Sequence, residues 1–376
     1  MKRIYLDNNA TTALAPEVLE EMMPFFTSDY GNPSSFHTFG SSVLDRLAKA
    51  REQVATLIGA NPDEIIFTSG GTESDNMALR GCSALRGGAV VTTAVEHPAV
   101  LETAMHLGGP ARIVGVDSSG TLDMKTFRSS LDGASVTSVM FANNETGTLM
   151  PVKEAAAFSH EAGVPFHTDA VQAVGKVFVN VEELGVDMLS LSAHKFHGPK
   201  GVGALYLRRG MALPPLVTGG HQEKGMRAGT YNAAGIIGIG KAAELAQAHL
   251  LEEGFVKKLL DRFESGVLSR CPGAMIMAKE SPRLPNTSTV IFRGIESEAV
   301  LTLLDIQGIY ASSGSACSTG SKDPSHVLMA MGLDHNLANS AVRFSLSRFT
   351  TEEELDHAVN ALTGIVEKLR AISPYT

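Results

Sequence analysis

The 376-residue sequence predicts an α/β fold, with a large domain on a mostly parallel sheet and a smaller α+β domain. Short apolar runs alternate with helical stretches between residues 64 and 207, an order typical of parallel strands covered by helices on both faces. After Tyr231 the alternation gives way to long helices and few strands. At roughly 150 residues per domain, a chain of this length is expected to hold about two domains.

The expected elements of the first part follow one another along the chain. Helices are predicted at residues 16–26 and 42–58, on either side of a loop at 30–35 that contains Gly31 and Pro33. Strands are predicted at 64–68, 89–95, 111–116, 136–142, 164–168, 188–192 and 203–207. Helices at 70–85, 98–107, 124–131 and 152–162 fall between some of these strands.

The part of the chain after Tyr231 has a different order of predicted elements. Residues 233–260 are predicted as one long helix or two linked helices. A strand at 289–292, a helix at 296–306, a strand at 341–346 and a helix at 351–369 follow. We therefore predict a large domain over residues 15–255 and a small domain formed by residues 1–14 together with 256–376.

Composition excludes several classes of function. Hydrophobic residues make up 44% and charged residues 19%, as in ordinary globular proteins. A net charge of -9 argues against a general nucleic-acid or anionic-membrane binder, because both need a basic surface. No window reaches 18 apolar residues, and residues 1–7 lack the apolar stretch of a signal peptide. We expect a cytoplasmic protein with neither a membrane nor a nucleic-acid partner.

The three cysteines are Cys82, Cys271 and Cys317, and none forms the C-x-x-C spacing of a metal or redox site. Their odd number and wide separation argue against a disulfide framework and fit a reducing cytosol. Cys317 lies in the run 312–321 of small and polar residues, which we expect to be mobile and exposed. A cysteine in that setting is more plausibly a nucleophile, whereas Cys82 and Cys271 are interpreted as structural.

A glycine-rich turn at residues 68–76 follows a strand and opens a helix. Gly70 and Gly71 allow close approach of a ligand to the backbone, and Thr72 adds a hydroxyl at a helix N-terminus that favours phosphate. The alternative is an ordinary helix-capping turn. No lysine stands at the spacing of a nucleotide-triphosphate P-loop.

Two further strand ends carry ionisable residues. Asp169 ends a predicted strand, where it could hold a protonated ring nitrogen or simply cap a helix. Lys195 follows the strand at 188–192, and a partly desolvated lysine makes a good Schiff-base amine. Ser192 and His194 beside it could bind a phosphate. A surface lysine with incidental neighbours is the alternative.

Three other residues could contact a substrate or a flat cofactor. Arg343 lies in a predicted strand, and its guanidinium could bind a carboxylate or form a structural salt bridge. Asn144, after another strand, could serve the same carboxylate or only make a turn. His97 could stack on a ring or cap the next helix.

Together and in this order, these motifs resemble the class V aminotransferase superfamily of pyridoxal 5′-phosphate (PLP) enzymes of fold type I. Within it the chain resembles cysteine desulfurases of the NifS/IscS type, over nearly its whole length. The matching stretches are YLDNNATT at 5–12, GNPSS at 31–35, TSGGTESDN at 68–76, EHPAV at 96–100, NNETG at 143–147, HTDAVQAVGK at 167–176, SAHKFHGPKG at 192–201, SSGSAC at 312–317 and RFSLSR at 343–348.

The resemblance implies a role for each site residue. Lys195 would carry the cofactor and move protons, Asp169 would pair with the ring nitrogen, and His97 would stack on the ring and assist proton transfer. Gln172 would bond the ring hydroxyl, and Asn144 and Arg343 would hold the substrate carboxylate. The phosphate would be held by Gly71, Thr72, Ser192 and His194, with Thr230 reaching the phosphate of a partner subunit in a homodimer.

The implied reaction converts L-cysteine to alanine and leaves the sulfur on Cys317 as a persulfide. A sulfur-acceptor protein, such as an iron–sulfur scaffold or a thiolation enzyme, would then receive it. Two alternatives stay open at this point. One is another PLP enzyme, such as a selenocysteine lyase or an aminotransferase, and the other is a catalytically idle scaffold on the same fold.

Overall fold

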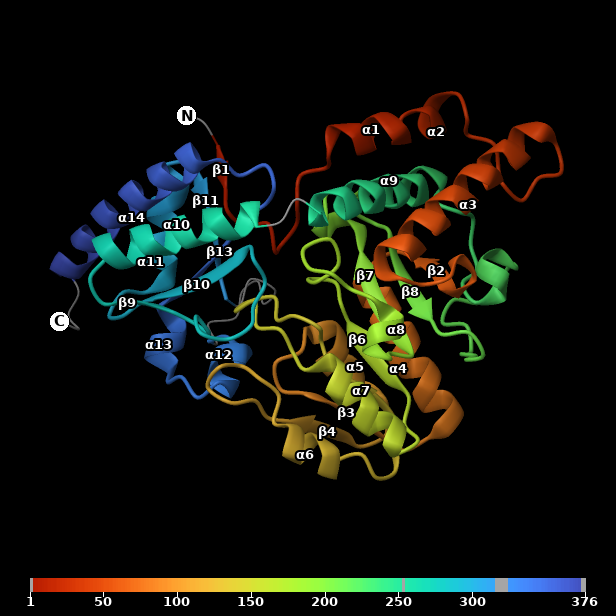
Figure 1. Cartoon of the computed structure of the whole chain (residues 1–376), viewed down its shortest axis with the longest axis horizontal. Helices are drawn as coiled ribbons and strands as arrows, with labels where there is room; N and C mark the ends of the chain where they lie inside the picture. Colours follow the sequence, from red (N-terminus) through yellow and green to blue (C-terminus); the bar gives the residue numbers. More distant parts are fainter. Residues whose placement is uncertain (1–2, 252–253, 315–323, 373–376) are drawn as a thin grey trace.

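The structure is a computed structural model that describes residues 3–251, 254–314 and 324–372 (Figure 1). Its centre is a seven-stranded sheet in the order β2-β8-β7-β6-β5-β3-β4. All neighbouring strands are parallel except β8, which is antiparallel to both β2 and β7. The strands are β2 Ile65–Thr68, β3 Ala89–Thr93, β4 Ala111–Val114, β5 Ala134–Ser138, β6 Phe166–Asp169, β7 Met188–Ser192 and β8 Gly203–Leu207. The predicted α/β class with a mostly parallel sheet is confirmed.

Helices cover both faces of this sheet except at the edge strand β4, where Ile113 is exposed, and side chains along each strand alternate between the two faces. In β2, Ile65 and Phe67 pack with the helices of one face, and Ile66 packs with those of the other. One face is covered by α4 Gly71–Arg86 and α5 Pro98–His106. The other face is covered by α1 Pro16–Met22, α3 Thr38–Ile58, α7 Val152–Glu161 and α9 Ala233–Leu250.

Several boundaries differ from the prediction for local reasons. The single helix expected at 16–26 is wrong: it divides into α1 and α2 Pro24–Thr27, and Pro24 stands at the break. Proline lacks the N–H that would continue the ladder. α3 begins at Thr38, where His37 caps it by accepting the Gly40 N–H at 3.0 Å. The stretch 233–260 holds α9 and the start of α10 Phe255–Arg270. The other short helices are α6 Met124–Ser129 and α8 Val181–Leu184.

A second body of structure lies beside the large sheet, with the N-terminal strand inside it (Figure 1). It holds a four-stranded antiparallel sheet, β12-β13-β10-β9, and a parallel pair, β1-β11. Ile4 and Leu6 share an apolar core with Phe263 and Phe344, whose rings lie 4.9 Å apart. The strands are β1 Ile4–Tyr5, β9 Ala274–Ile276, β10 Thr287–Phe292, β11 Ile309–Tyr310, β12 Ser312–Ser313 and β13 Ala341–Ser345. The helices are α10, α11 Ser297–Ile306, α12 His326–Ala330, α13 His335–Asn339 and α14 Glu352–Ile372.

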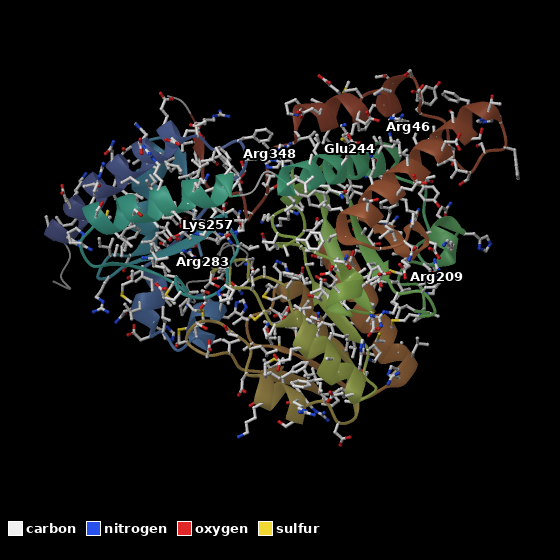
Figure 2. The ribbon with its side chains drawn as sticks, in the orientation of Figure 1. Arg46, Arg209, Glu244, Lys257, Arg283 and Arg348 are labelled. Carbon is white, nitrogen blue, oxygen red and sulfur yellow. The ribbon has the colours of Figure 1, made fainter. Side chains whose placement is uncertain are left out.

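The two bodies are joined at the loop that follows β5. Leu284 donates its N–H to the carbonyl of Gly147 at 2.8 Å, and Leu149 donates to the carbonyl of Pro282 at 2.9 Å. Between these bonds lies Arg283, which Figure 2 labels, and its buried guanidinium pairs with the carboxylate of Glu264 at 2.6 Å. The exact domain boundaries stay a prediction. Among the described residues, no helix is long and apolar enough to cross a membrane.

Candidate active site

Most of the predicted site residues line one cavity of about 270 Å³. It lies where β6 and β7 end and where α4 begins after β2, which is the ligand-binding edge of parallel α/β sheets. The predicted residues that line it are Gly71, Thr72, His97, Asn144, Asp169, Gln172, Ser192, His194 and Lys195.

One end of the cavity is suited to a phosphate. The first N–H groups of α4 have no acceptor within the helix, and the positive end of its dipole faces an anion placed there. A Cβ added to Gly71 would lie 2.6 Å from Cγ2 of Val171, so only glycine fits at this helix start. Burial lowers the pKa of His194 to about 4, so this imidazole is neutral at pH 7. Its Nδ1 lies 3.1 Å from Oγ1 of Thr11.

Two carboxyl groups, those of Asp75 and Asp169, line the cavity, and the buried carboxyl of Glu96 lies near both. Asp169 accepts the N–H of Val171 at 2.9 Å, and burial raises the pKa of this carboxyl. Asp75 is 1% exposed, and its Oδ1 has no hydrogen-bond partner among the described residues. Burial, followed by the charge of Asp169, raises the pKa of Asp75. Burial also raises the pKa of Glu96, to about 8. Such a site favours a bound cation, as a protonated pyridine nitrogen would be.

The amine of Lys195 stands at the wall formed by the N-terminal segment. Its Nζ donates to the carbonyl of Ala10 at 3.0 Å and to that of Asn9 at 2.5 Å. His97 caps α5 by accepting the Ala99 N–H on Nδ1 at 3.1 Å, and burial lowers the pKa of this imidazole. With a phosphate cradle, an acidic pocket for a ring nitrogen and an amine on one cavity, these residues fit PLP.

Residues absent from the predicted set also build this site. Ala10 and Asp75 line the cavity, and Asn9 binds both Lys195 and Gln172 through its carbonyl. All three belong to stretches that carry the family resemblance, at 5–12 and 68–76. Their position within those stretches was the signal that could have identified them. A contact between Asn9 and Lys195, however, cannot be predicted from the pattern of neighbouring residues in sequence.

Three predicted residues lie outside the cavity or the described structure. Arg343 is 2% exposed, and its guanidinium donates to Oδ1 of Asp7 at 2.8 Å and to the carbonyl of Asn144 at 2.9 Å. It therefore contacts the site through Asn144. Thr230 is exposed and does not line this cavity. Cys317 lies outside the described residues.

The other two cysteines lie in apolar surroundings. Cys82 and Cys271 are both buried, and burial raises the pKa of each thiol, to about 12 for Cys82. A thiol with a raised pKa is a poor nucleophile at neutral pH. This setting agrees with the structural interpretation of both residues.

Comparisons with known proteins give one consistent answer. The aminotransferase class-V family model matches residues 4–358. The cysteine desulfurase NifS of Azotobacter vinelandii is 51% identical over 385 residues, covering 100% of this chain and 95% of that protein. A cysteine desulfurase of Gluconacetobacter diazotrophicus is 50% identical over 384 residues, covering 100% of this chain and 96% of that protein.

Solved structures agree with the sequence comparisons. A NifS-like protein superposes with a TM-score of 0.92 at 40% identity, covering 98% of this chain and 100% of that chain. The apo structure of a cysteine desulfurase from Thermococcus onnurineus NA1 gives a TM-score of 0.86 at 26% identity, covering 98% of this chain and 95% of that chain.

Proposed function

The chain belongs to the class-V aminotransferase family and is a PLP-dependent cysteine desulfurase, and from this premise we propose that Cys317 accepts the sulfur of L-cysteine. The substrate C–S bond breaks, the Cys317 sulfur bonds to the departing sulfur, and a proton replaces the sulfur on carbon. The products are alanine and a Cys317 persulfide. The observation that carries the proposal is the single cavity that holds the Lys195 amine, the Asp169 carboxyl and the start of α4.

The bound cofactor supplies an electron sink for the pair released at the substrate Cα. Asp169 would keep the ring nitrogen protonated, and that positive charge is what makes the sink strong. Lys195 and the neutral His97 are the bases beside the cavity, and each can hold or deliver a proton at the substrate carbon. Thr72, Ser192 and the α4 N–H groups would hold the phosphate.

Arg343 is proposed to bind the substrate carboxylate, together with Asn144. In the described structure its guanidinium is already paired with Asp7, whose side chain is only partly exposed. A substrate carboxylate would therefore compete with Asp7 for the same donors. If the substrate carboxylate replaces that of Asp7, the buried guanidinium of Arg343 keeps an anionic partner throughout. The exchange therefore avoids the free-energy cost of an isolated buried charge.

The position of the residues that flank Cys317 supports its assignment. A Cβ added to Gly314 would lie 2.5 Å from Oε2 of Glu145, and Ser325 Oγ donates to that same oxygen at 2.5 Å. Glu145 adjoins Asn144, which lines the cavity. Cys317 is three positions after Gly314, and a chain that short spans at most ~11 Å. We therefore propose that Cys317 can reach the cavity that Asn144 lines.

The test is to incubate the PLP-loaded protein with L-cysteine and a thiol reductant, and to quantify alanine and sulfide. Wild type should release equal amounts of both, and Cys317→Ala should fall to background while keeping its yellow colour. Cys271→Ala is the matched control and should retain activity, because that thiol is buried and structural. Undiminished release by Cys317→Ala would sink the persulfide assignment and favour a lyase or an aminotransferase.

We further propose a cytoplasmic homodimer in which Thr230 completes the phosphate site of the partner subunit. The exposure of Thr230, which does not line the cavity of its own subunit, supports this arrangement. Lys195→Ala and Thr230→Val subunits should each bind PLP poorly or without a covalent link. Mixing them should restore one complete site per hybrid dimer, whereas independent sites would give only the average of the two variants.

The physiological acceptor of the sulfur is proposed to be an iron–sulfur scaffold or another sulfur-acceptor protein. Transfer can be followed by loading the enzyme with ³⁵S-labelled cysteine, removing free cysteine and adding a purified scaffold protein. Label should move to the scaffold from wild type and not from Cys317→Ala. Label retained on the enzyme would exclude that scaffold as the acceptor.

A further inference from the structure

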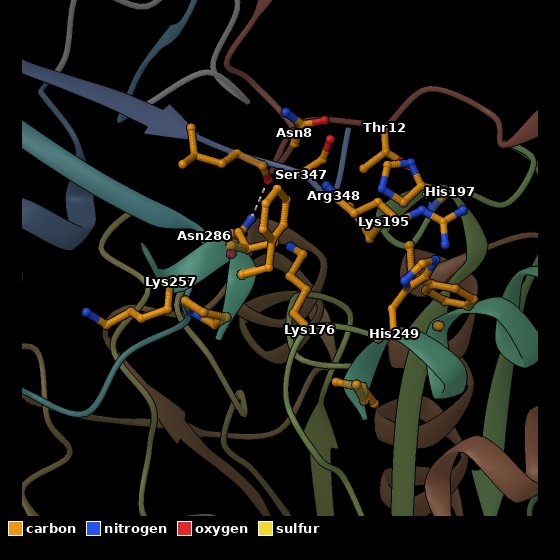
Figure 3. Close-up of a pocket in the computed structure, with 18 of the residues that line it drawn as sticks. Asn8, Thr12, Lys176, Lys195, His197, His249, Lys257, Asn286, Ser347 and Arg348 are labelled. Carbon is orange, nitrogen blue, oxygen red and sulfur yellow. Dashed lines mark hydrogen bonds between the residues drawn. The ribbon is translucent and has the colours of Figure 1, made fainter. Parts of the chain in front are cut away.

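Lys176, which has no role in the proposed reaction, contacts the cofactor-cavity residue Gln172. Lys176 Nζ lies 2.6 Å from Oε1 of Gln172 and 3.2 Å from Oδ1 of Asn9. Lys176 does not line the cofactor cavity but borders a second cavity of about 160 Å³, on the other side of Lys195. Figure 3 shows Lys176 from this second cavity, with its amine end directed toward Asn286. Lys176 can therefore affect the cofactor site through Gln172.

Backbone carbonyls fix the direction of the two amides that face this lysine. Gln172 Nε2 donates to the carbonyl of Asn9 at 2.9 Å, and Asn9 Nδ2 donates to the carbonyl of Asn144 at 3.1 Å. A carbonyl only accepts, so the nitrogen end of each amide must point at its carbonyl. The oxygen end of each amide therefore points at Lys176.

The amine of Lys176 complements these two oxygens. Burial lowers its pKa well below the ordinary lysine range, and the nearby cations Lys195 and Arg343 lower it further. The amine donates to both amide oxygens, Asn9 Oδ1 and Gln172 Oε1, and it can do so in either protonation state. Turning the Gln172 amide over would break both of its present bonds, the one it accepts from Lys176 and the one it donates to the Asn9 carbonyl.

We propose that Lys176 is a positioning residue that holds the Gln172 amide with its N–H₂ end toward the cofactor cavity. One of these two N–H groups is used by the Asn9 carbonyl, and the other is left to donate to the ring oxygen of the cofactor. This inference rests on the proposed function, because it assumes PLP in that cavity. A donor at this oxygen stabilises its negative form, which makes the neighbouring nitrogen that joins Lys195 to the cofactor release its proton more easily.

The test is a pH titration of the visible absorbance of the PLP-loaded protein, which reports protonation of that nitrogen. Lys176→Met keeps the length of the side chain and removes the donor. The titration midpoint should rise by about one pH unit, a tenfold tighter hold on the proton. Lys176→Gln retains an N–H₂ group that can reach Gln172, and its midpoint should stay near wild type. Lys257→Met, in the wall of the same second cavity, is the control and should not shift.

A double-mutant cycle separates positioning from a general structural effect. Gln172→Met alone should raise the midpoint as Lys176→Met does, and Lys176→Met added to it should change nothing more. Additive shifts, or a rise in Gln172→Met without one in Lys176→Met, would overturn the proposal. Failure of the proposed function is distinguishable, because wild type would then release no alanine or sulfide from cysteine whatever the midpoints of the variants.

Discussion

A methyl group added to Gly71 should weaken cofactor binding, and the structure sets the size of the effect. The new Cβ would lie 2.6 Å from Cγ2 of Val171, against an ordinary carbon–carbon contact of about 3.5–4.0 Å. Val171 is β-branched with a stiff side-chain torsion, so relief requires it to shift into the cavity that it lines. Overpacking of this kind costs about 1–3 kcal/mol. We expect Gly71→Ala to lose about 5- to 150-fold in PLP affinity.

The assay is a titration of apoprotein with PLP, followed by its visible absorbance, together with urea unfolding of the apoprotein. Val171→Ala removes the clashing methyl, so Gly71→Ala in that background should bind PLP as Val171→Ala alone does. Gly364→Ala is the matched control, since beyond its chain neighbours and the backbone of α14 no described atom lies within 4 Å of its added Cβ, and the position is exposed. It should leave PLP affinity unchanged and raise stability by up to about 1 kcal/mol. An unchanged affinity in Gly71→Ala would refute the packing argument.

Two further predictions concern stability. Burial raises the pKa of Glu145 from its ordinary 4.5 to about 7, so the folded state holds this proton more tightly than the unfolded state. The free energy of unfolding should therefore fall as pH rises from 4.5 through 7. Glu145→Gln should flatten that slope and gain up to about 3 kcal/mol at pH 8, measured by urea unfolding. An unchanged slope in the variant would contradict the assignment. Arg283→Met should cost about 3–5 kcal/mol, because it strands the buried carboxylate of Glu264. Arg209→Met removes an exposed pair of the same kind (Figure 2) and should cost under about 1 kcal/mol, so equal losses would argue against burial as the cause.

Local pattern predicted the parts of this protein whose structure depends on near neighbours in sequence. Alternating strands and helices indicated the α/β class, because each element needs only its own periodicity. The glycine-rich turn at 70–71, Asp169 and Lys195 were all identified as residues just after strands. Parallel strands end at one edge, so these residues meet in one cavity without any detailed knowledge of packing.

Other features depend on contacts between distant residues, and only the tertiary structure decided them. The strands β1 and β11 contain two residues each, too few for a periodic signal, and they exist because they pair across about 300 residues of sequence. The same return of the N-terminus brings Asn9 to Lys195, Gln172 and Lys176.

Arg343 makes the same point at the level of a single side chain. The sequence left a substrate carboxylate and a structural salt bridge as equal alternatives, and the folded chain places Asp7 on its guanidinium. A buried cation must have an anionic partner, but which of many carboxylates supplies it is settled by packing. The sequence determined which chemical groups the site contains. Long-range packing determined which of these groups bind one another, which of them orient a neighbouring side chain, and which shift the pKa of a neighbour.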